Sequence, residues 1–266
     1  MTAARWAASS AMALLLLVAA ATKVAHTDPR CSVPPDLTRF KVSLPNTARA
    51  IQSGNALLIL AIGSSSTEGI GASDGAHTYP ALLAEELHRR WPQLSVTVIN
   101  KGVGGELAYQ MLARFDRDVL PYHPQLVIWQ TGSNQALMFG DIKGYADTMR
   151  EGISRLKAAR LDVVLMDPQF APRLLARPIH PFIVHSIGAV ADEMKVAVFQ
   201  RFAIMRHWIS SGQYKIEDLI SNDGLHMNDV SYSCIARLLA DSLVAAADAR
   251  PDARRASEPA KDARSR

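Results

Sequence analysis

Short apolar runs alternate with amphipathic stretches along most of the chain. Five runs have the length and composition of buried strands, at residues 56–62, 95–100, 125–132, 161–168 and 196–200. Five longer stretches carry apolar residues at helical spacing, at residues 79–91, 106–120, 145–160, 180–195 and 231–247. Alternation of this kind is typical of a parallel sheet that is covered by helices on both faces. We therefore predict one doubly wound α/β domain with about five strands.

Composition agrees with one ordinary soluble domain. The chain has 266 residues, of which 48% are hydrophobic and 20% are charged. The net charge is +4, and the basic residues are interspersed with Asp and Glu except in the C-terminal stretch. A nucleic-acid-binding protein would carry a basic stripe with interleaved aromatic residues, which this sequence lacks. We expect no nucleic acid, no integral membrane partner and a monomer.

The first residues have the pattern of a targeting segment. Arg5 precedes an apolar run from Ala11 to Ala21, which has the length of a signal-peptide core and is short for a membrane span. We predict a cleaved signal peptide over residues 1–25, with an uncleaved membrane anchor as the alternative, and hence an exported protein, periplasmic or secreted. Three further segments follow from composition: an N-terminal arm at 26–55, the α/β domain at 56–247, and a charged, disordered tail at 248–266.

Export changes the interpretation of the two cysteines. Cys31 follows the predicted signal peptide, and Cys234 lies in the last predicted helix. Two cysteines in an oxidising compartment can pair, so we predict a disulfide that ties the arm to that helix. The alternative is a pair of unbonded small apolar residues.

The loop after the first predicted strand is the first place where chemistry is expected, because functional groups collect at the carboxyl ends of parallel strands. It reads Gly63-Ser64-Ser65-Ser66-Thr67-Glu68-Gly69. The loop lacks the Lys of a phosphate-binding P-loop, the third glycine of a dinucleotide loop and the final glycine of an α/β-hydrolase nucleophile elbow. What remains is G-x-S-x-T, which is either a nucleophile at the sheet edge or a polar turn.

Two further strand ends carry hydrogen-bond donors. Asn100-Lys101-Gly102-Val103-Gly104-Gly105 follows the second strand, and its glycines leave backbone N–H groups unobstructed for an oxyanion. Gly132-Ser133-Asn134 follows the third strand, and an Asn side-chain amide can donate to a developing negative charge. The alternatives are a flexible turn for the first and an Asx turn or helix cap for the second.

The segment before the last predicted helix reads Asp223-Gly224-Leu225-His226-Met227-Asn228. An Asp three residues ahead of a His can turn back onto the imidazole and fix its tautomer. The alternative is a helix N-cap beside a surface histidine. The chain shows no HExxH motif and no Cys/His cluster, so we expect neither a metal nor another cofactor.

Together these four stretches resemble the SGNH hydrolases, also called GDSL esterases and lipases. The blocks of that family look like G-D-S-x-[ST], N-x-x-x-x-G, G-x-N-D and D-x-x-H, and here they read G-S-S-S-T, N-K-G-V-G-G, G-S-N-Q and D-G-L-H. The resemblance spans roughly residues 56–245 in the same order. It implies a flavodoxin-like, three-layer α/β/α fold and serine hydrolysis of esters or related acyl compounds.

The resemblance also implies roles for individual residues. Ser65 would be the nucleophile, His226 the general base and Asp223 the residue that orients it. The oxyanion hole would combine the backbone N–H groups of Ser65 and Gly105 with the side-chain amide of Asn134.

Two departures from the family pattern concern carboxylates: Ser64 and Gln135 stand where relatives carry Asp. Neither is a core catalytic position, so we expect activity with short acyl esters, including acetyl groups on glycans. A non-catalytic carbohydrate-binding or assembly protein is the main alternative. A nucleotide-binding flavodoxin-like protein is a second alternative, although it would give Asp223 and His226 no function.

Overall fold

The structure is a computed structural model that describes residues 28–54, 56–138 and 142–248. The predicted signal peptide lies outside the described residues, as does the predicted tail except for Asp248. The described chain contains a five-stranded sheet in the order β2-β1-β3-β4-β5, and every pair of neighbouring strands is parallel. The strands are β1 Leu57–Gly63, β2 Val96–Gly102, β3 Leu126–Gln130, β4 Asp162–Met166 and β5 Ala197–Phe199.

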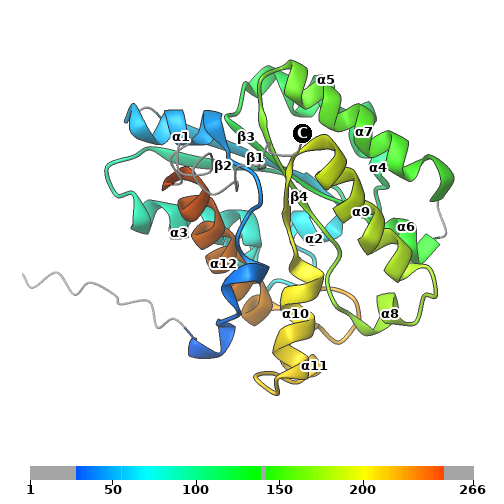
Figure 1. Ribbon diagram of the computed structural model, residues 1–266. Helices are drawn as coiled ribbons and strands as arrows, with labels where there is room; N and C mark the ends of the chain where they lie inside the picture. Colours follow the sequence, from blue (N-terminus) through cyan, green and yellow to red (C-terminus); the bar gives the residue numbers. More distant parts are fainter. Residues whose placement is uncertain (1–27, 55, 139–141, 249–266) are drawn as a thin grey trace, which may run out of the picture.

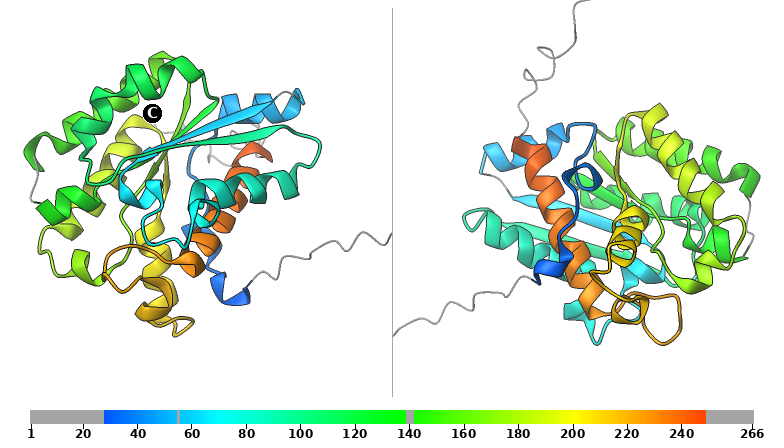
Figure 2. Two further views of the ribbon diagram at one scale, coloured as in Figure 1. Left: turned by 180° about the vertical axis from the view of Figure 1, so that it is seen from behind. Right: turned by 60° about the horizontal axis from the view of Figure 1, so that its bottom comes forward.

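Helices cover both faces of this sheet (Figures 1 and 2). One layer contains α1 (Pro45–Gln52), α3 (Tyr79–Arg90) and α12 (Asp229–Asp248); α12 packs on both α1 and α3, α3 packs on β2, and α1 packs on β1 and β4. The other contains α4 (Ala108–Ala113), α7 (Ile142–Ala158) and α9 (His180–Met194), which pack on each other, β4 and β5. The prediction of a parallel, doubly covered α/β/α fold is confirmed.

The strands are buried because both of their faces are covered. Every residue of β3 and β4 is buried, which explains their nearly unbroken apolar sequences. Trp129 of β3 is fully buried and meets the ring of Phe115 edge-on, with 5.1 Å between ring centroids. A Cβ atom on Gly152 of α7 would lie 2.4 Å from the Trp129 ring, so only glycine lets this helix approach the strand so closely.

The remaining elements are short, except for α10. They are α2 Ser65–Glu68, α5 Phe115–Asp118, α6 Ser133–Met138, α8 Pro172–Leu175, α10 Arg201–Ser210, α11 Ile216–Leu219 and the 3₁₀ turns η1 Pro29–Cys31, η2 Pro35–Leu37, η3 Gly75–His77 and η4 Leu120–Tyr122. The single helix predicted over residues 106–120 is wrong, since it divides at Arg114 into α4 and α5. The Arg114 side chain turns into the protein and donates 2.8 Å to the Lys101 carbonyl.

The strand order defines where a site is expected. The chain passes from β1 outward to β2 and then returns across β1 to β3. The connections on the two sides of β1 therefore leave in opposite directions, which opens a crevice at the carboxyl ends of β1 and β3. The loops after these two strands hold Ser65 and Asn134.

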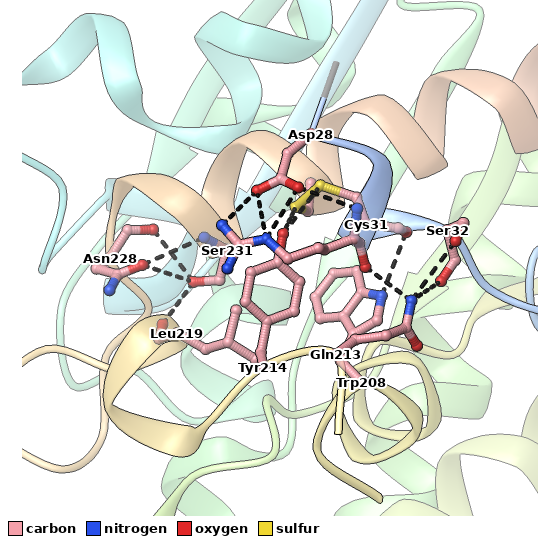
Figure 3. The surroundings of a disulfide bond; sticks show 11 residues. Asp28, Cys31, Ser32, Trp208, Gln213, Tyr214, Leu219, Asn228 and Ser231 are labelled. Atoms are coloured by element: carbon pink, nitrogen blue, oxygen red, sulfur yellow. Dashed lines mark hydrogen bonds and ion pairs between the residues drawn. A yellow bond between two sulfur atoms is a disulfide. The ribbon is translucent and has the colours of Figure 1, made fainter. Parts of the chain in front are cut away.

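The N-terminal arm is fastened to the C-terminal helix by the Cys31–Cys234 disulfide, as predicted, with 5.3 Å between the two Cα atoms. Figure 3 shows the buried surroundings of this bond. Trp208 of α10 donates its ring N–H to the Cys31 carbonyl at 3.2 Å. Gln213 donates to the carbonyls of Arg30 and Ser32 at 2.8 and 2.9 Å. The arm is thus held against α10 and α12 by backbone contacts as well as by the covalent bond.

Candidate active site

The first functional loop begins where β1 ends. Gly63 closes the strand, Ser64 caps α2 and Ser65 is the first residue of that helix. A Cβ atom on Gly63 would lie 2.1 Å from Oγ1 of Thr67, so glycine is required for the tight strand-to-helix turn. This turn places Ser65 at the carboxyl edge of the sheet.

The side chains of Ser65, His226 and Asp223 form one continuous hydrogen-bonded chain. Oγ of Ser65 lies 2.8 Å from Nε2 of His226, and Nδ1 of His226 bonds to Oδ2 of Asp223. A carboxylate only accepts hydrogen bonds, so Nδ1 carries the proton and Nε2 is left to accept from the Ser65 hydroxyl. The structure therefore brings together the three residues predicted to act as nucleophile, base and orienting acid.

Asp223 is fixed by its own loop. Its Oδ1 accepts hydrogen bonds from the backbone N–H groups of Leu225 and His226, at 2.8 and 2.9 Å, and from the Ser221 hydroxyl at 2.9 Å. Burial acts to raise the pKa of Asp223, but the His226 ring and these donors outweigh it and hold the pKa below its usual range. The carboxylate stays ionised and can stabilise a protonated His226.

The glycine block after β2 lies against the nucleophile loop. Gly105 has a φ of +80°. Neither its N–H group nor that of Ser65 donates a hydrogen bond to any atom of the described residues. A Cβ atom on Gly104 would lie 4.0 Å from Cβ of Ser65, which shows how closely the two loops approach. Two backbone N–H groups that donate to no atom of the described residues, on adjacent loops, suit an oxyanion.

Asn134 lies at the start of α6 and points toward the same glycine block. Its Nδ2 donates 2.9 Å to the carbonyl of Glu106, the residue after Gly105. An amide group carries two N–H donors, so one remains for a substrate oxygen. Arg114 supports the block from behind, because its guanidinium contacts the Glu106 carboxylate at 2.7 Å and the Lys101 carbonyl at 2.8 Å.

Ser64 occupies the position where the related motif carries Asp, and its partner is Gln130 at the end of β3. Oε1 of Gln130 accepts from the Ser64 N–H at 2.9 Å, the Ser64 hydroxyl at 3.1 Å and the Thr67 hydroxyl at 3.2 Å. The nucleophile loop is thus anchored by a neutral carbonyl oxygen. Gln135, at the second departure, is buried, and its Oε1 has no partner among the described residues.

Sequence reasoning missed three buried polar residues around this site: Gln130, Gln169 and Arg201. Two of them follow the rule that polar groups after strands matter, since Gln130 ends β3 and Gln169 comes three residues after β4. Arg201 opens a helix that was not predicted. Within the described part of the chain, no group of three His, Cys, Asp or Glu residues is arranged to hold a metal ion.

Proteins that resemble this chain include one curated arylesterase and two esterases of known structure. An arylesterase of Vibrio mimicus is 26% identical over 167 residues, which cover 63% of this chain and 78% of the relative. The structure of a two-domain esterase (CEX) active on acetylated mannans has a TM-score of 0.68 at 19% identity, covering 85% of this chain and 58% of that one. Axe2, an acetylxylan esterase from Geobacillus stearothermophilus, has a TM-score of 0.59 at 20% identity, with coverages of 70% and 94%.

These likenesses confirm the fold, and the chain spans little more than half of the two-domain esterase. A family model described as the Non-GDSL lipase-like family matches residues 30–249. That name agrees with the first motif, in which Ser64 replaces the Asp of G-D-S. With most of its length matched by this model, the chain belongs to the Non-GDSL lipase-like family.

Proposed function

We propose that the protein is a serine esterase that hydrolyses carboxylic esters through an acyl-serine intermediate. The observation that carries the proposal is the 2.8 Å contact between Oγ of Ser65 and Nε2 of His226, with Asp223 on the other ring nitrogen. This geometry lets a neutral imidazole take the serine proton as the hydroxyl attacks a carbonyl.

The reaction proceeds in two halves. In the first, Ser65 attacks the ester carbonyl, His226 takes the Ser65 proton, and His226 then protonates the leaving alcohol. In the second, His226 activates a water that attacks the acyl-serine and releases the acid. In both halves the N–H groups of Ser65 and Gly105 and the amide of Asn134 stabilise the tetrahedral oxyanion.

The proposed substrates carry short acyl groups, with acetyl esters on glycans as the preferred class. One structural neighbour is an esterase active on acetylated mannans, and another is an acetylxylan esterase. Ile70 and Val103 are exposed apolar residues on the segments that follow Ser65 and precede Gly105. Export remains part of the proposal, and the Cys31–Cys234 disulfide supports it because such bonds persist in oxidising compartments.

A fluorophosphonate probe and p-nitrophenyl acetate test the proposed activity. We expect the probe to label Ser65 in the folded protein, and the acetate to give a burst of p-nitrophenol that Ser65→Ala abolishes. Full activity of Ser65→Ala with loss of activity in Ser64→Ala or Ser66→Ala would show that another serine attacks. Absence of labelling in folded wild-type protein would favour a non-catalytic carbohydrate-binding or assembly protein.

A panel of p-nitrophenyl esters of increasing chain length, together with acetylated xylan and mannan oligosaccharides, tests the substrate class. We expect kcat/KM to be highest for acetyl esters and to fall with acyl length. Highest kcat/KM for long acyl chains would retain the esterase and overturn the acetyl preference.

A further inference from the structure

Gln169 is the centre of a buried hydrogen-bond network behind the candidate active site. It lies in the loop after β4 and is 1% exposed. Its Oε1 accepts from the hydroxyls of Ser66 and Ser133 at 3.2 and 3.0 Å, and from Nη2 of Arg201 at 3.1 Å. Its Nε2 donates to the Leu225 carbonyl at 2.9 Å. One side chain therefore joins four other segments of the chain.

The partners of Gln169 dictate which end of the amide faces which segment. A guanidinium can only donate, so the oxygen must face Arg201, and a carbonyl can only accept, so the nitrogen must face Leu225. A carboxylate could serve the first end and an amine the second, but an amide serves both. The residue type at position 169 is thus specified by its surroundings.

Three of the partners are each adjacent in the sequence to a candidate site residue. Ser66 follows the candidate nucleophile Ser65, and Leu225 precedes the candidate base His226. Ser133 in turn precedes the candidate oxyanion donor Asn134. Among the described residues, no hydrogen bond joins Gln169 to Ser65, Asn134 or His226 themselves, yet Gln169 bonds to the immediate neighbour of each of them. Such contacts fix the distances between loops that arrive from three separate parts of the sequence.

We propose that Gln169 is a positioning residue that fixes the positions of the nucleophile Ser65, the oxyanion amide of Asn134 and the base His226 relative to one another. The inference rests on the proposed esterase function. Arg201 stabilises the arrangement: its guanidinium is fully buried and also donates from Nε to the Asp167 carbonyl at 3.0 Å. Because the network is buried, loss of Gln169 takes a hydrogen-bond partner away from two hydroxyls, a carbonyl and the Arg201 guanidinium, and the loops must shift to satisfy them.

Two substitutions separate positioning from mere stability. Gln169→Met keeps the length of the side chain and removes all four bonds, whereas Gln169→Glu keeps an acceptor for Ser66, Ser133 and Arg201 and loses the donor to Leu225. We expect Gln169→Met to lower kcat by about 10²-fold with KM changed less than about threefold, since a misplacement of about 1 Å costs that much in rate. Gln169→Glu should lose about tenfold, because it breaks one of the four bonds and therefore displaces the loops less.

The matched control is Thr47→Val, which removes another fully buried hydrogen-bonding side chain, at the opposite edge of the sheet. It should lower the melting temperature and leave kcat within about twofold, because burial loss away from the loops changes stability alone. The inference is overturned if folded Gln169→Met keeps kcat within about threefold of wild type, or if Thr47→Val loses as much kcat as Gln169→Met. If Gln169→Met does not fold, unchanged kcat in Gln169→Glu and in Ser133→Ala overturns it.

Wild-type measurements distinguish this failure from failure of the proposed function. Wild-type protein that neither hydrolyses p-nitrophenyl acetate nor labels at Ser65 refutes the esterase, and the positioning role with it. Active wild-type protein with fully active Gln169 variants refutes the positioning role alone.

Discussion

The side chain of Asn134 donates a 2.9 Å hydrogen bond to the backbone carbonyl of Glu106, so the loop after β3 is tied directly to the glycine block after β2. This bond uses one N–H of the amide and sets the direction of the other. The two donors that we propose for the oxyanion, the N–H of Gly105 and the amide of Asn134, are therefore held on connected loops before any substrate binds. Preorganised donors of this kind contribute most when they need no rearrangement during the reaction.

Asn134→Ala should therefore lower kcat by about 10²- to 10³-fold with little change in KM, as for the loss of one oxyanion donor. Steady-state kinetics with p-nitrophenyl acetate measure the change. Asn46→Ala is the control, because Asn46 donates at 3.0 Å to Asp162 at the amino end of β4. Equal kcat in Asn134→Ala and wild type would remove Asn134 from the oxyanion hole.

Gln130 and Gln125 offer a matched pair at the two ends of one strand. Gln130→Met removes the acceptor of the Ser64 N–H and of two hydroxyls in the nucleophile loop. Gln125→Met removes the acceptor of the Leu58 N–H at the opposite end, a 2.8 Å bond. Gln130→Met should reduce the free energy of unfolding by about 1–3 kcal/mol, the cost of an unsatisfied buried donor. Gln125→Met should reduce it by about 1 kcal/mol, because its bond to Leu58 is only partly buried.

Only Gln130→Met should also lower kcat, by about tenfold or more, since it alone releases the loop that carries Ser65. Urea unfolding and ester hydrolysis measured on the same preparations separate the two effects. A similar loss of kcat in Gln125→Met would show that the activity follows global stability.

Asp167 should make the stability of the protein depend on pH. Burial raises its pKa to about 7, against the opposing influence of the Phe202 N–H and the Arg201 charge, while the unfolded chain keeps a value near 3.8. Between these values the folded protein holds a proton that the unfolded chain has lost. The resulting stabilisation is fully present below about pH 4 and is lost as the pH rises to about 7.

Asp167→Asn keeps a neutral side chain whose oxygen can still accept from the Phe202 N–H. The variant should match the wild-type melting temperature near about pH 4 and exceed it near about pH 8. Carboxylates with a lowered pKa, such as Asp118 and Asp223, titrate in both proteins, so their contribution to the pH dependence of stability cancels in the comparison. A difference in melting temperature that does not vary with pH would exclude an ionising Asp167 as its source.

The Cys31–Cys234 bond should stabilise the fold without taking part in the reaction. Replacing both cysteines by serine should reduce the free energy of unfolding by about 2–5 kcal/mol, given the long loop that the bond closes. Ester hydrolysis by the folded variant should stay within about twofold of wild type, because no hydrogen bond in the described structure joins either cysteine to Ser65, Asp223 or His226. Titration of denatured, unreduced wild-type protein should find no free thiol, and two free thiols would contradict the bond.

The sequence pattern predicted the sheet well because parallel strands are buried on both faces and read as plain apolar runs. It failed where charged side chains turn inward. Arg114 is 6% exposed and Arg201 is fully buried, so the helix containing Arg114 was predicted without its break and the helix beginning at Arg201 was not predicted. Prediction of a helix from periodicity places every arginine on the exposed face, so a buried arginine is assigned to the wrong face.

The motifs predicted which loops meet: three of them follow strands of the same sheet, and the fourth, Asp223–His226, directly precedes α12. They could not predict what holds the loops together. The amino-acid sequence alone does not distinguish Gln169, which bonds to the segment before His226, from Gln213, which bonds to the N-terminal arm. That distinction depends on which way each side chain faces, and this is decided only when the layers have packed.

The pairing of Cys31 with Cys234 has a topological consequence. Every residue assigned to the reaction, from Ser65 to His226, lies between these two cysteines. The bond therefore closes residues 31–234 into one covalent ring, and the two ends of the chain leave this ring at Cys31 and Cys234. A protease that cuts the ring once in any surface loop releases no fragment, and all the reacting groups stay on one molecule.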